Sequence, residues 1–553
     1  MRNKTAWLIL VPAFVFLTLH CNQVYSTPKN SVYEIFVRSF YDSNGDGIGD
    51  LNGLREKLDY LNDGNPNTDK DLEVGILWLM PIFPSPSYHG YDVNDYRGIN
   101  PDYGTLNDFD NLIKSAHHRG IRILLDITFN HTSNQHPWFK DAVEHPITSP
   151  YKDYYFLRID NKPVGDSLWR KGSDWHWVEN SSGQKVYYFG DFSYTMPDLN
   201  MSNPKVREEV KQIAKFWLDR GADGFRLDAA KHIFAWTDQL TPEEIRQNID
   251  WWEEFSDFVY SIDPTAILVG EVLDSPEIVQ QFAAGLDAEL DFHFKYHLRE
   301  FVKKPYPGFL ELWKNYFDEA RQNNADFELF PFLSSHDTNP RFASFVKENL
   351  KLDDDAVYRV AMYLLFTMDK YPILYYGDEI KQEGWKWKGN DPPEGDGSHI
   401  YDETLREPFQ WYGDQTGAGQ TSWFLPRFDN PNDGISVEEQ SPNDSSMLSL
   451  VRALTNFRAA HPEFCDGEIS NILEDTAEQI VFEKQSGDKT YLILINDSPQ
   501  AVEYDPAGFQ DARLLFWSDG LNKQWMNFSG DERVEDSISI PPFGLVMIGD
   551  NLH

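Results

Sequence analysis

The chain has 553 residues, of which 41% are hydrophobic and 15% are aromatic, so general disorder is excluded. Its length predicts two or three domains rather than one compact core. The formal net charge of −40 argues against nucleic acid and anionic membrane surfaces as partners, because both would repel the protein.

The first 26 residues have the pattern of a secretion leader. Arg2 and Lys4 form a basic start, and the apolar run Ala6–Leu19 follows. This run is shorter than the ~20 residues that span a membrane comfortably. Cleavage after Ser26 would release a secreted protein, either extracellular or periplasmic.

A second fate for this leader is attachment to a lipid. Cys21 would then become the modified N-terminal residue, although His20 stands where a small residue is expected. Both fates stay open, and a lipid anchor is the one membrane association that we expect. Cys465 is the only other cysteine, so the chain has no disulfide framework.

A glycine-rich acidic loop follows the first predicted strand, Val32–Phe36. Oxygen-bearing side chains alternate there with glycines, as a hard cation such as Ca²⁺ requires. The alternative is a polar turn without metal. We predict a structural Ca²⁺ site whose ligands are Asp42, Asn44, Asp46, the Ile48 carbonyl and Asp50.

Short apolar runs recur along the chain and alternate with helical patterns, which predicts an α/β fold. One such helix has clear boundaries, with Asn203 as its cap, Pro204 in its first position and Gly221 after its last turn. The later strands are predicted at Gly75–Ile82, Ile121–Phe129, Gly224–Asp228, Ile267–Val269, Leu286–Phe294, Leu329–Leu333 and Tyr371–Tyr375.

Polar residues stand at the ends of several of these strands. Arg226 and Asp228 are two residues apart, so on a strand their side chains point to the same side. The arginine would favour the ionised form of the aspartate, which suits a nucleophile. An isolated pair of this kind is more often structural, so the neighbouring motifs decide between the two interpretations.

Four segments together resemble the signatures of the α-amylase family (glycoside hydrolase family 13), in the family's order. They are Asp126–His131, Gly224–His232, Gly270–Val272 and Ser335–Asp337. The resemblance covers nearly the whole chain after the leader. It implies a (β/α)₈ TIM barrel with a small inserted domain and a C-terminal all-β sandwich.

The resemblance also implies the chemistry of the site. Asp228 would be the nucleophile, Glu271 the general acid and base, and Asp337 the carboxylate that stabilises the distorted sugar. Asp126 would support Arg226. The implied substrate-binding residues are Tyr91, His131, Arg226, Lys231, His232 and His336. The Asp42 loop also resembles a calcium loop that many members of the family carry.

Three segments bear on specificity within the family. Tyr88–Asp92 and Ala229–His232 look like their counterparts in α-1,4-acting amylases, and Met196 replaces the glutamine that is usual in oligo-1,6-glucosidases. The resemblance therefore implies hydrolysis of internal α-1,4 bonds in starch-like glucans by a monomer. The alternatives are an exo-acting α-glucosidase, an oligo-1,6-glucosidase, a transglycosylase or, more remotely, a non-catalytic glucan-binding protein.

The predicted domains follow from these elements. The barrel comprises residues 31–131 and 201–464 and ends with a helix at Met447–Ala460. The aromatic and polar stretch 132–200 is too long for an ordinary loop and forms the insertion. Residues 465–553 form the sandwich, with short strands that include Tyr491–Ile495, Ala512–Trp517 and Ser537–Ile540.

Overall fold

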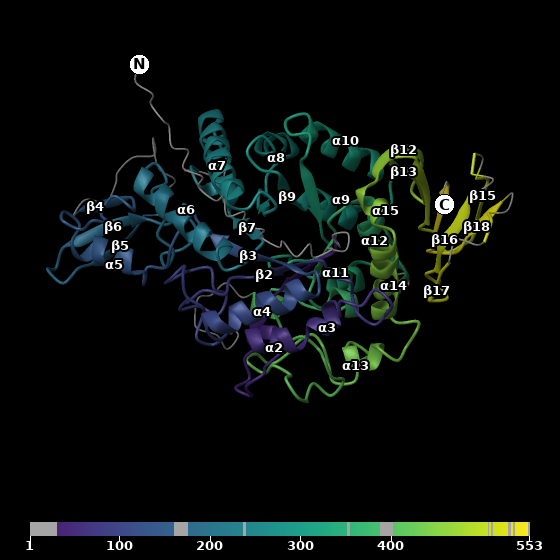
Figure 1. The fold of residues 1–553 in the computed structure, drawn as a ribbon, viewed down its shortest axis with the longest axis horizontal. Helices are drawn as coiled ribbons and strands as arrows, with labels where there is room; N and C mark the ends of the chain where they lie inside the picture. The colour runs from purple at the N-terminus through teal and green to yellow at the C-terminus, as the bar shows by residue number, and fades with distance from the viewer. Residues whose placement is uncertain are drawn as a thin grey trace, which may run out of the picture.

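The computed structural model describes residues 30–159, 175–235, 239–350, 354–386, 402–506, 508–509, 512–528, 532–534 and 537–550 (Figure 1). The predicted leader with Cys21 lies outside these residues and stays a prediction. Within the described ranges, no helix has the length and apolar character that a membrane span needs.

The central element is a barrel of eight parallel strands, as predicted. The strands are hydrogen-bonded in the order β10, β9, β8, β7, β3, β2, β1, β11, and a parallel bridge between Phe332 and Ile373 joins the two ends of this order. The strands are β1 (Val32–Ile35), β2 (Ile76–Leu79), β3 (Arg122–Thr128), β7 (Gly224–Asp228), β8 (Ile267–Gly270), β9 (Ala288–Asp291), β10 (Glu328–Pro331) and β11 (Ile373–Tyr375).

Helices surround the barrel (Figure 1). The predicted start of α6 is confirmed, because the Asn203 side chain accepts a hydrogen bond from the Lys205 amide and Pro204 occupies the first turn. The long helices are α4 (Leu106–His118), α6 (Pro204–Leu218), α7 (Pro242–Ile262), α9 (Phe292–Lys303), α10 (Phe309–Arg321), α12 (Asp354–Met368) and α14 (Met447–Ala460). The shorter ones are α1 (Val37–Phe40), α2 (Leu51–Glu56), α3 (Leu58–Leu61), α8 (Pro276–Phe282), α11 (Phe342–Asn349), α13 (Val437–Gln440) and α15 (Pro462–Asp466).

The barrel interior is a packed core, not a pore. Side chains from successive strands meet there, among them Val32, Trp78, Leu124, Val269, Phe330 and Ile373, all buried. The outward-facing side chains of the same strands pack against the helices. The open ends of the barrel are therefore where this scaffold is expected to present polar groups to a ligand.

The predicted sixth strand, Leu286–Phe294, is too long. β9 covers only Ala288–Asp291, and the last three residues of the prediction begin α9. The Asp291 side chain accepts a hydrogen bond from the Phe294 amide at 2.8 Å and caps this helix. The alternation of polar and apolar residues continues past Asp291 with His293, so the pattern alone could not mark the end of the strand.

The segment between β3 and α6 leaves the barrel on one side (left in Figure 1). It contains α5 (Pro137–Glu144) and an antiparallel sheet in the order β4 (Leu157–Ile159), β6 (Lys185–Phe189), β5 (Trp175–Glu179). An antiparallel bridge pairs His131 with Asp198, so the insertion leaves and rejoins the barrel at one point.

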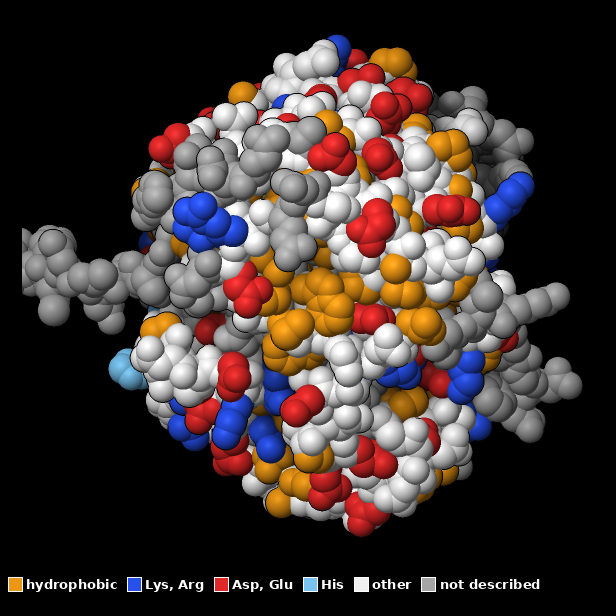
Figure 2. All heavy atoms as spheres, turned by 90° about the vertical axis from the view of Figure 1, so that its right-hand side faces the viewer, with side chains coloured by type: hydrophobic (Ala, Val, Ile, Leu, Met, Phe, Trp, Pro, Cys, Tyr) orange, Lys and Arg blue, Asp and Glu red, His pale blue; other side chains and the backbone are white. Residues whose placement is uncertain are grey.

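Antiparallel sheets follow the barrel at the C-terminal end, as predicted. One has the order β12 (Glu468–Asp475), β13 (Gln479–Ser486), β14 (Lys489–Asn496), β19 (Leu545–Asp550), β16 (Arg513–Asp519), β17 (Gln524–Asn527). The other pairs β15 (Val502–Tyr504) with β18 (Ile538–Ile540), and apolar side chains of both sheets form a common core. Acidic side chains are spread over the face shown in Figure 2, around a central apolar area.

Candidate active site

A cavity of about 400 Å³ opens at the carboxyl ends of the barrel strands. The three predicted catalytic carboxylates, Asp228, Glu271 and Asp337, all line it. They come from β7, from the residue after β8 and from the loop after β10. The barrel thus gathers residues that are distant from one another in the sequence.

Arg226 connects three carboxylates beneath this cavity. Its Nη1 atom lies 2.7 Å from an oxygen of Asp126 and 2.7 Å from an oxygen of Asp228, and its Nη2 atom lies 2.9 Å from Glu271. The guanidinium is 1% exposed. Because one planar cation binds both Asp228 and Glu271, their carboxyl groups are held on the same side of the cavity.

A left-handed residue completes this arrangement. Ala229, directly after Asp228, has φ of 49° and ψ of 40°. Its amide donates a hydrogen bond to an oxygen of Glu271 at 3.0 Å. A non-glycine residue in this conformation is uncommon and is found mainly where surrounding contacts enforce it. The backbone turn therefore contributes to the position of the second carboxylate.

The predicted effect of Arg226, which favours the ionised form of Asp228, is one of several effects on this carboxyl group. Burial raises the pKa of Asp228 well above its usual range; Arg226 lowers it, while Glu271 and Asp126 raise it. Three carboxylates share a single guanidinium, so they cannot all ionise without repulsion. This crowding favours one retained proton within the group, which a general acid needs.

Asp337 lies in a second ionic group. His336 contacts Asp337 through Nε2 at 2.9 Å and Glu34 through Nδ1 at 2.6 Å. Although burial lowers the pKa of His336, Asp337 and Glu34 raise it to about 10, so the imidazole is charged. Against the desolvation of the site, His336 and Arg406 hold the pKa of Asp337 well below its usual range.

Tyr91 joins the two groups. Its hydroxyl donates to Asp126 at 2.9 Å and lies 2.7 Å from Nε2 of His336, and its ring stacks on the His336 ring. His131 Nε2 donates to the Tyr91 carbonyl at 3.2 Å. Burial lowers the pKa of His131 to about 4, so this imidazole is neutral. Tyr91 and His131 both line the cavity, as expected for substrate-binding residues.

Lys231 and His232 lie outside the cavity lining. The Lys231 ammonium donates to the Leu273 carbonyl at 2.7 Å and lies 2.9 Å from Asp274. His232 Nδ1 lies 3.0 Å from Asp191 in the insertion. In this structure both residues hold loops around the site, so their predicted contact with sugar stays a prediction.

Several residues of the site are not among those predicted to be catalytic or to bind substrate. Arg406 lies 3.0 Å from Asp337 and 2.9 Å from Asp402. From the insertion, Phe192 and Tyr194 line the cavity although they are 50% and 61% exposed. The one signal for Phe192 and Tyr194 was the aromatic character of the insertion; no short motif marks these residues.

The predicted calcium loop forms consecutive turns. Asp42 accepts hydrogen bonds from the amides of Asn44, Gly45 and Gly47, and Asn44 and Asp46 each accept from the amide two residues later. Asp50 caps α2 instead, by accepting from the Gly53 amide at 2.8 Å. Among the described residues, no group of three or more acidic, histidine or cysteine side chains is close enough to hold a metal ion.

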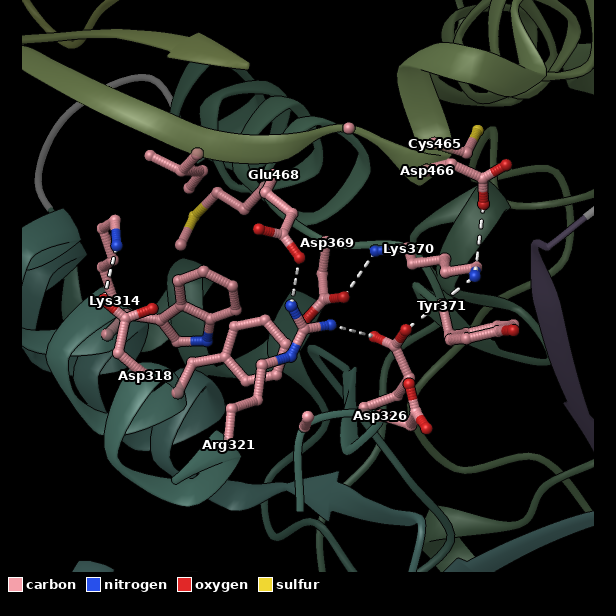
Figure 3. A pocket seen from close by; sticks show the side chains of 17 residues that line it. Lys314, Asp318, Arg321, Asp326, Asp369, Lys370, Tyr371, Cys465, Asp466 and Glu468 are labelled. Carbon is pink, nitrogen blue, oxygen red and sulfur yellow. Dashed lines mark hydrogen bonds and ion pairs between the residues drawn. The ribbon is translucent and has the colours of Figure 1, made fainter. Parts of the chain in front are cut away.

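A second cavity, of about 500 Å³, is lined by residues at the starts of β10 and β11, so it lies at the end of the barrel opposite to the first cavity. Figure 3 shows it from close by. It separates α10 from the segment Cys465–Ile469, which leads into β12. Arg321 lies 2.5 Å from Glu468 and Lys370 lies 3.2 Å from Asp466. These ion pairs connect the barrel to the C-terminal sheet.

Comparison with known proteins agrees with this geometry. Residues 34–467 match the family described as alpha amylase, catalytic domain. Alpha-amylase 3 of Dictyoglomus thermophilum is 38% identical over 473 residues, which is 85% of each chain. A 4-alpha-glucanotransferase of Thermotoga maritima is 31% identical over 489 residues, 85% of this chain and 99% of that protein.

A solved structure gives the same result in three dimensions. The crystal structure of the alpha-amylase from H. orenii has a TM-score of 0.78 and 37% sequence identity, and the match covers 95% of this chain and 100% of that one. The family match covers more than half of the chain and includes all three carboxylates of the site. The chain therefore belongs to the α-amylase family of glycoside hydrolases (glycoside hydrolase family 13).

Proposed function

We propose that the protein is a retaining endo-acting α-amylase that cleaves internal α-1,4-glucosidic bonds in starch, glycogen and maltooligosaccharides. The observation that carries this proposal is the pair of Asp228 and Glu271 on the two nitrogens of one guanidinium. Retaining glycosidases hold their two carboxyl groups ~5–5.5 Å apart, and a shared arginine supports such a short separation.

The reaction proceeds in two steps, and Asp228 and Glu271 act in both. Asp228 attacks the anomeric carbon while Glu271 gives its proton to the glycosidic oxygen, so the bond to the leaving sugar breaks as the bond to Asp228 forms. Glu271, now ionised, then takes a proton from water, and the resulting hydroxide releases the sugar from Asp228. Asp337 binds sugar hydroxyls, and the Tyr91 ring packs against the sugar that reacts.

The walls of the cavity support action within a chain. Phe192 and Tyr194 present exposed aromatic faces on the side of the insertion, where the sugar units next to the cleaved bond would stack. The similarity to a 4-alpha-glucanotransferase supports glycosyl transfer as the second candidate function. In that case a sugar hydroxyl replaces water in the second step, and the residues keep their roles.

Product analysis tests the proposal. We expect a fast fall in iodine staining of soluble starch, and mixed short products from a maltooligosaccharide labelled at its reducing end. Glu271→Gln should lower the rate by about 10²- to 10⁴-fold, the usual contribution of a general acid. Glu277→Gln, an exposed acid on α8, serves as the matched control. Glucose as the only product, released from the non-reducing end, would contradict the endo-acting proposal. Products longer than the starting maltooligosaccharide would show that the protein transfers sugars instead of hydrolysing the bond.

We further propose that the loop Asp42–Asp50 binds a structural Ca²⁺ ion. Its successive turns bring oxygen donors onto a tightly curved backbone, which suits a hard cation. Since no three acidic side chains cluster there, the Asn44 amide and the Ile48 carbonyl would have to complete the ligand set.

Metal removal tests this site through stability. Chelation should lower the melting temperature of the purified protein, and added Ca²⁺ should restore it, because an ion that binds only the folded state stabilises it. Asp46→Ala should remove this response while the folded structure is kept, since Asp46 is exposed. An unchanged melting temperature after chelation would exclude the proposed ion.

A further inference from the structure

We propose that Lys295 positions the substrate by donating hydrogen bonds to the glucosyl unit on the leaving-group side of the cleaved bond. This inference rests on the proposed glycoside hydrolysis and assigns one more residue to that site. No sequence motif indicated Lys295, which directly follows the predicted strand Leu286–Phe294.

The topology places Lys295 at the mouth of the barrel. It lies in the first turn of α9, which begins directly after β9. In the barrel, β9 lies between β8, which is followed by Glu271, and β10, which leads to His336 and Asp337. The first turn of α9 therefore lies between the segments that carry the proposed acid and the third carboxylate.

The same topology decides which sugar Lys295 meets. In the closed strand order, β2 is four strands from β9 in either direction, so Tyr91, which follows β2, lies across the barrel mouth. If the reacting sugar packs on Tyr91, the sugar that leaves is joined to it through the oxygen facing Glu271. That leaving sugar then extends towards β8 and β9, where Lys295 lies.

The ammonium of Lys295 is held without an ionic partner. The residue is 6% exposed, and its Nζ atom lies 4.8 Å from the ring centre of Phe292, 4.1 Å from that of Tyr296 and 5.4 Å from that of Phe332. Lysines buried to this degree are almost always paired. Among the described residues, Nζ makes no ion pair or hydrogen bond, so its donors stay available to a ligand.

The charge of this ammonium is coupled to the reacting groups. Burial and the nearby Arg299 lower the pKa of Lys295 to about 7, whereas Asp337 and Glu271 raise it. Both carboxylates are thus near enough to act on the ammonium, although neither forms an ion pair with it. Aromatic faces hold a cation without using its N–H donors. A neutral sugar hydroxyl is the acceptor that fits such a donor in this position.

A pair of substrates tests this role. A maltooligosaccharide has a sugar as leaving group, whereas α-maltosyl fluoride has only fluoride there and needs no contact from Lys295. We expect Lys295→Met to lower kcat/KM for the maltooligosaccharide by about 10- to 100-fold, the effect of losing a hydrogen bond from a charged group. The rate with maltosyl fluoride should stay within about twofold of that of the unaltered enzyme.

Two further variants keep the test decisive. Lys295→Arg keeps a cation in the aromatic surroundings and should recover part of the lost rate with the maltooligosaccharide. Lys303→Met removes a half-exposed lysine from the same helix and should leave both rates unchanged. Melting temperatures show whether each variant is folded. If the Met variant is unfolded, the two substrates are compared with the Arg variant instead.

The outcomes separate this inference from the proposed function. An equal loss with both substrates, or no loss with either, would overturn the role of Lys295. If the unaltered protein cleaves no α-1,4-glucan and no maltosyl fluoride, the proposed function fails, and the inference fails with it. If the unaltered protein transfers sugars instead of hydrolysing them, the same comparison is made on the transfer products.

Discussion

Glu34 shows how a residue remote from the substrate can set the charge of the site. It lies fully buried in β1, and one of its oxygens is 2.6 Å from Nδ1 of His336. The other nitrogen of His336 contacts Asp337. Since the imidazole is held charged, it binds the two carboxylates at once and fixes the direction in which Asp337 points.

Replacement of Glu34 by glutamine should change the pH dependence of catalysis. The Glu34 carboxylate raises the pKa of His336, so Glu34→Gln should lower that pKa from about 10. His336 would then lose its proton at a lower pH, and the alkaline limb of kcat/KM should move towards neutrality. The pH profile of maltooligosaccharide cleavage measures this shift.

Glu289→Gln is a suitable control for this experiment. Glu289 is equally buried, and burial, with Asp291, raises its pKa well above the usual range, which favours the neutral form of the side chain. An amide in its place should leave the alkaline limb where it is. An unmoved limb in Glu34→Gln as well would contradict the role assigned to Glu34.

The residues found from the sequence share one property. Asp228, Glu271 and Asp337 stand in short motifs directly after apolar strands, so local pattern suffices to find them. Glu34 and His336 are 302 positions apart, and their contact depends on the closure of the barrel. Arg406 likewise lies 69 positions from Asp337, and no local pattern predicts their contact.

At the scale of single elements, the contact between β7 and β8 depends on a glycine. Gly224 begins β7, has φ of +146° and pairs with Ile267 of β8. A Cβ atom at this position would lie 1.9 Å from the Ile267 carbonyl oxygen. The absence of a side chain therefore lets the strands that carry Asp228 and Glu271 approach each other.

Gly224→Ala should destabilise the barrel strongly. We expect a loss of at least about 3 kcal/mol in the free energy of unfolding, because backbone atoms on the neighbouring strand must move. Gly487→Ala provides the control: Gly487 also has a positive φ, of +60°, but no atom lies within 4 Å of an added Cβ. It should cost only ~1–2 kcal/mol. Thermal unfolding of both variants measures these losses in stability, and equal losses would contradict the steric argument.

The strands were predictable where apolar runs are continuous and bounded by turns, as in β2 and β8. β9 was predicted too long, because its alternating pattern runs on into α9 and only the Asp291 cap ends it. The strands of the insertion were not predicted at all. They are short, and three of their side chains in β5 and β6 are exposed, so their burial pattern is weak.

For the whole molecule, buried acids govern how stability depends on pH. Burial raises the pKa values of Glu328, Asp369 and Asp378 to about 7 each, and that of Asp429 to about 8. In the unfolded chain these carboxyls ionise near pH 4. Between pH 4 and 8 these four carboxyls therefore bind more protons in the folded state than in the unfolded state, and their contribution to stability falls as pH rises.

We expect the melting temperature to be higher at pH 6 than at pH 8, with the decrease levelling off above pH 7 to 8, where these carboxyls are ionised in both states. The net charge of −40 acts in the same direction, because repulsion increases as further acids ionise. Salt should raise the melting temperature at pH 8, since it screens this repulsion. Asp369→Asn should reduce the pH dependence, and a melting temperature that rises between pH 6 and 8 would contradict the assignment.

The order of domains along the chain was predictable from changes in pattern, but their contacts were not. Arg321 of α10 reaches Glu468 of β12 across 147 positions, beside the cavity in Figure 3. Such pairs join surfaces that are each polar by themselves, so neither half carries a recognisable signal. Composition indicates that a second unit exists, and only the structure shows how it docks.

The stem of the insertion has an evolutionary consequence. The insertion departs and returns through the pairing of His131 with Asp198, so its length can change without altering the strands around it. Phe192 and Tyr194, which face the cavity, belong to this one contiguous stretch of chain. Recombination at its two adjacent ends would exchange one wall of the cleft in a single event. A lineage can thereby acquire a new preference for chain length while it inherits an unchanged set of catalytic carboxylates.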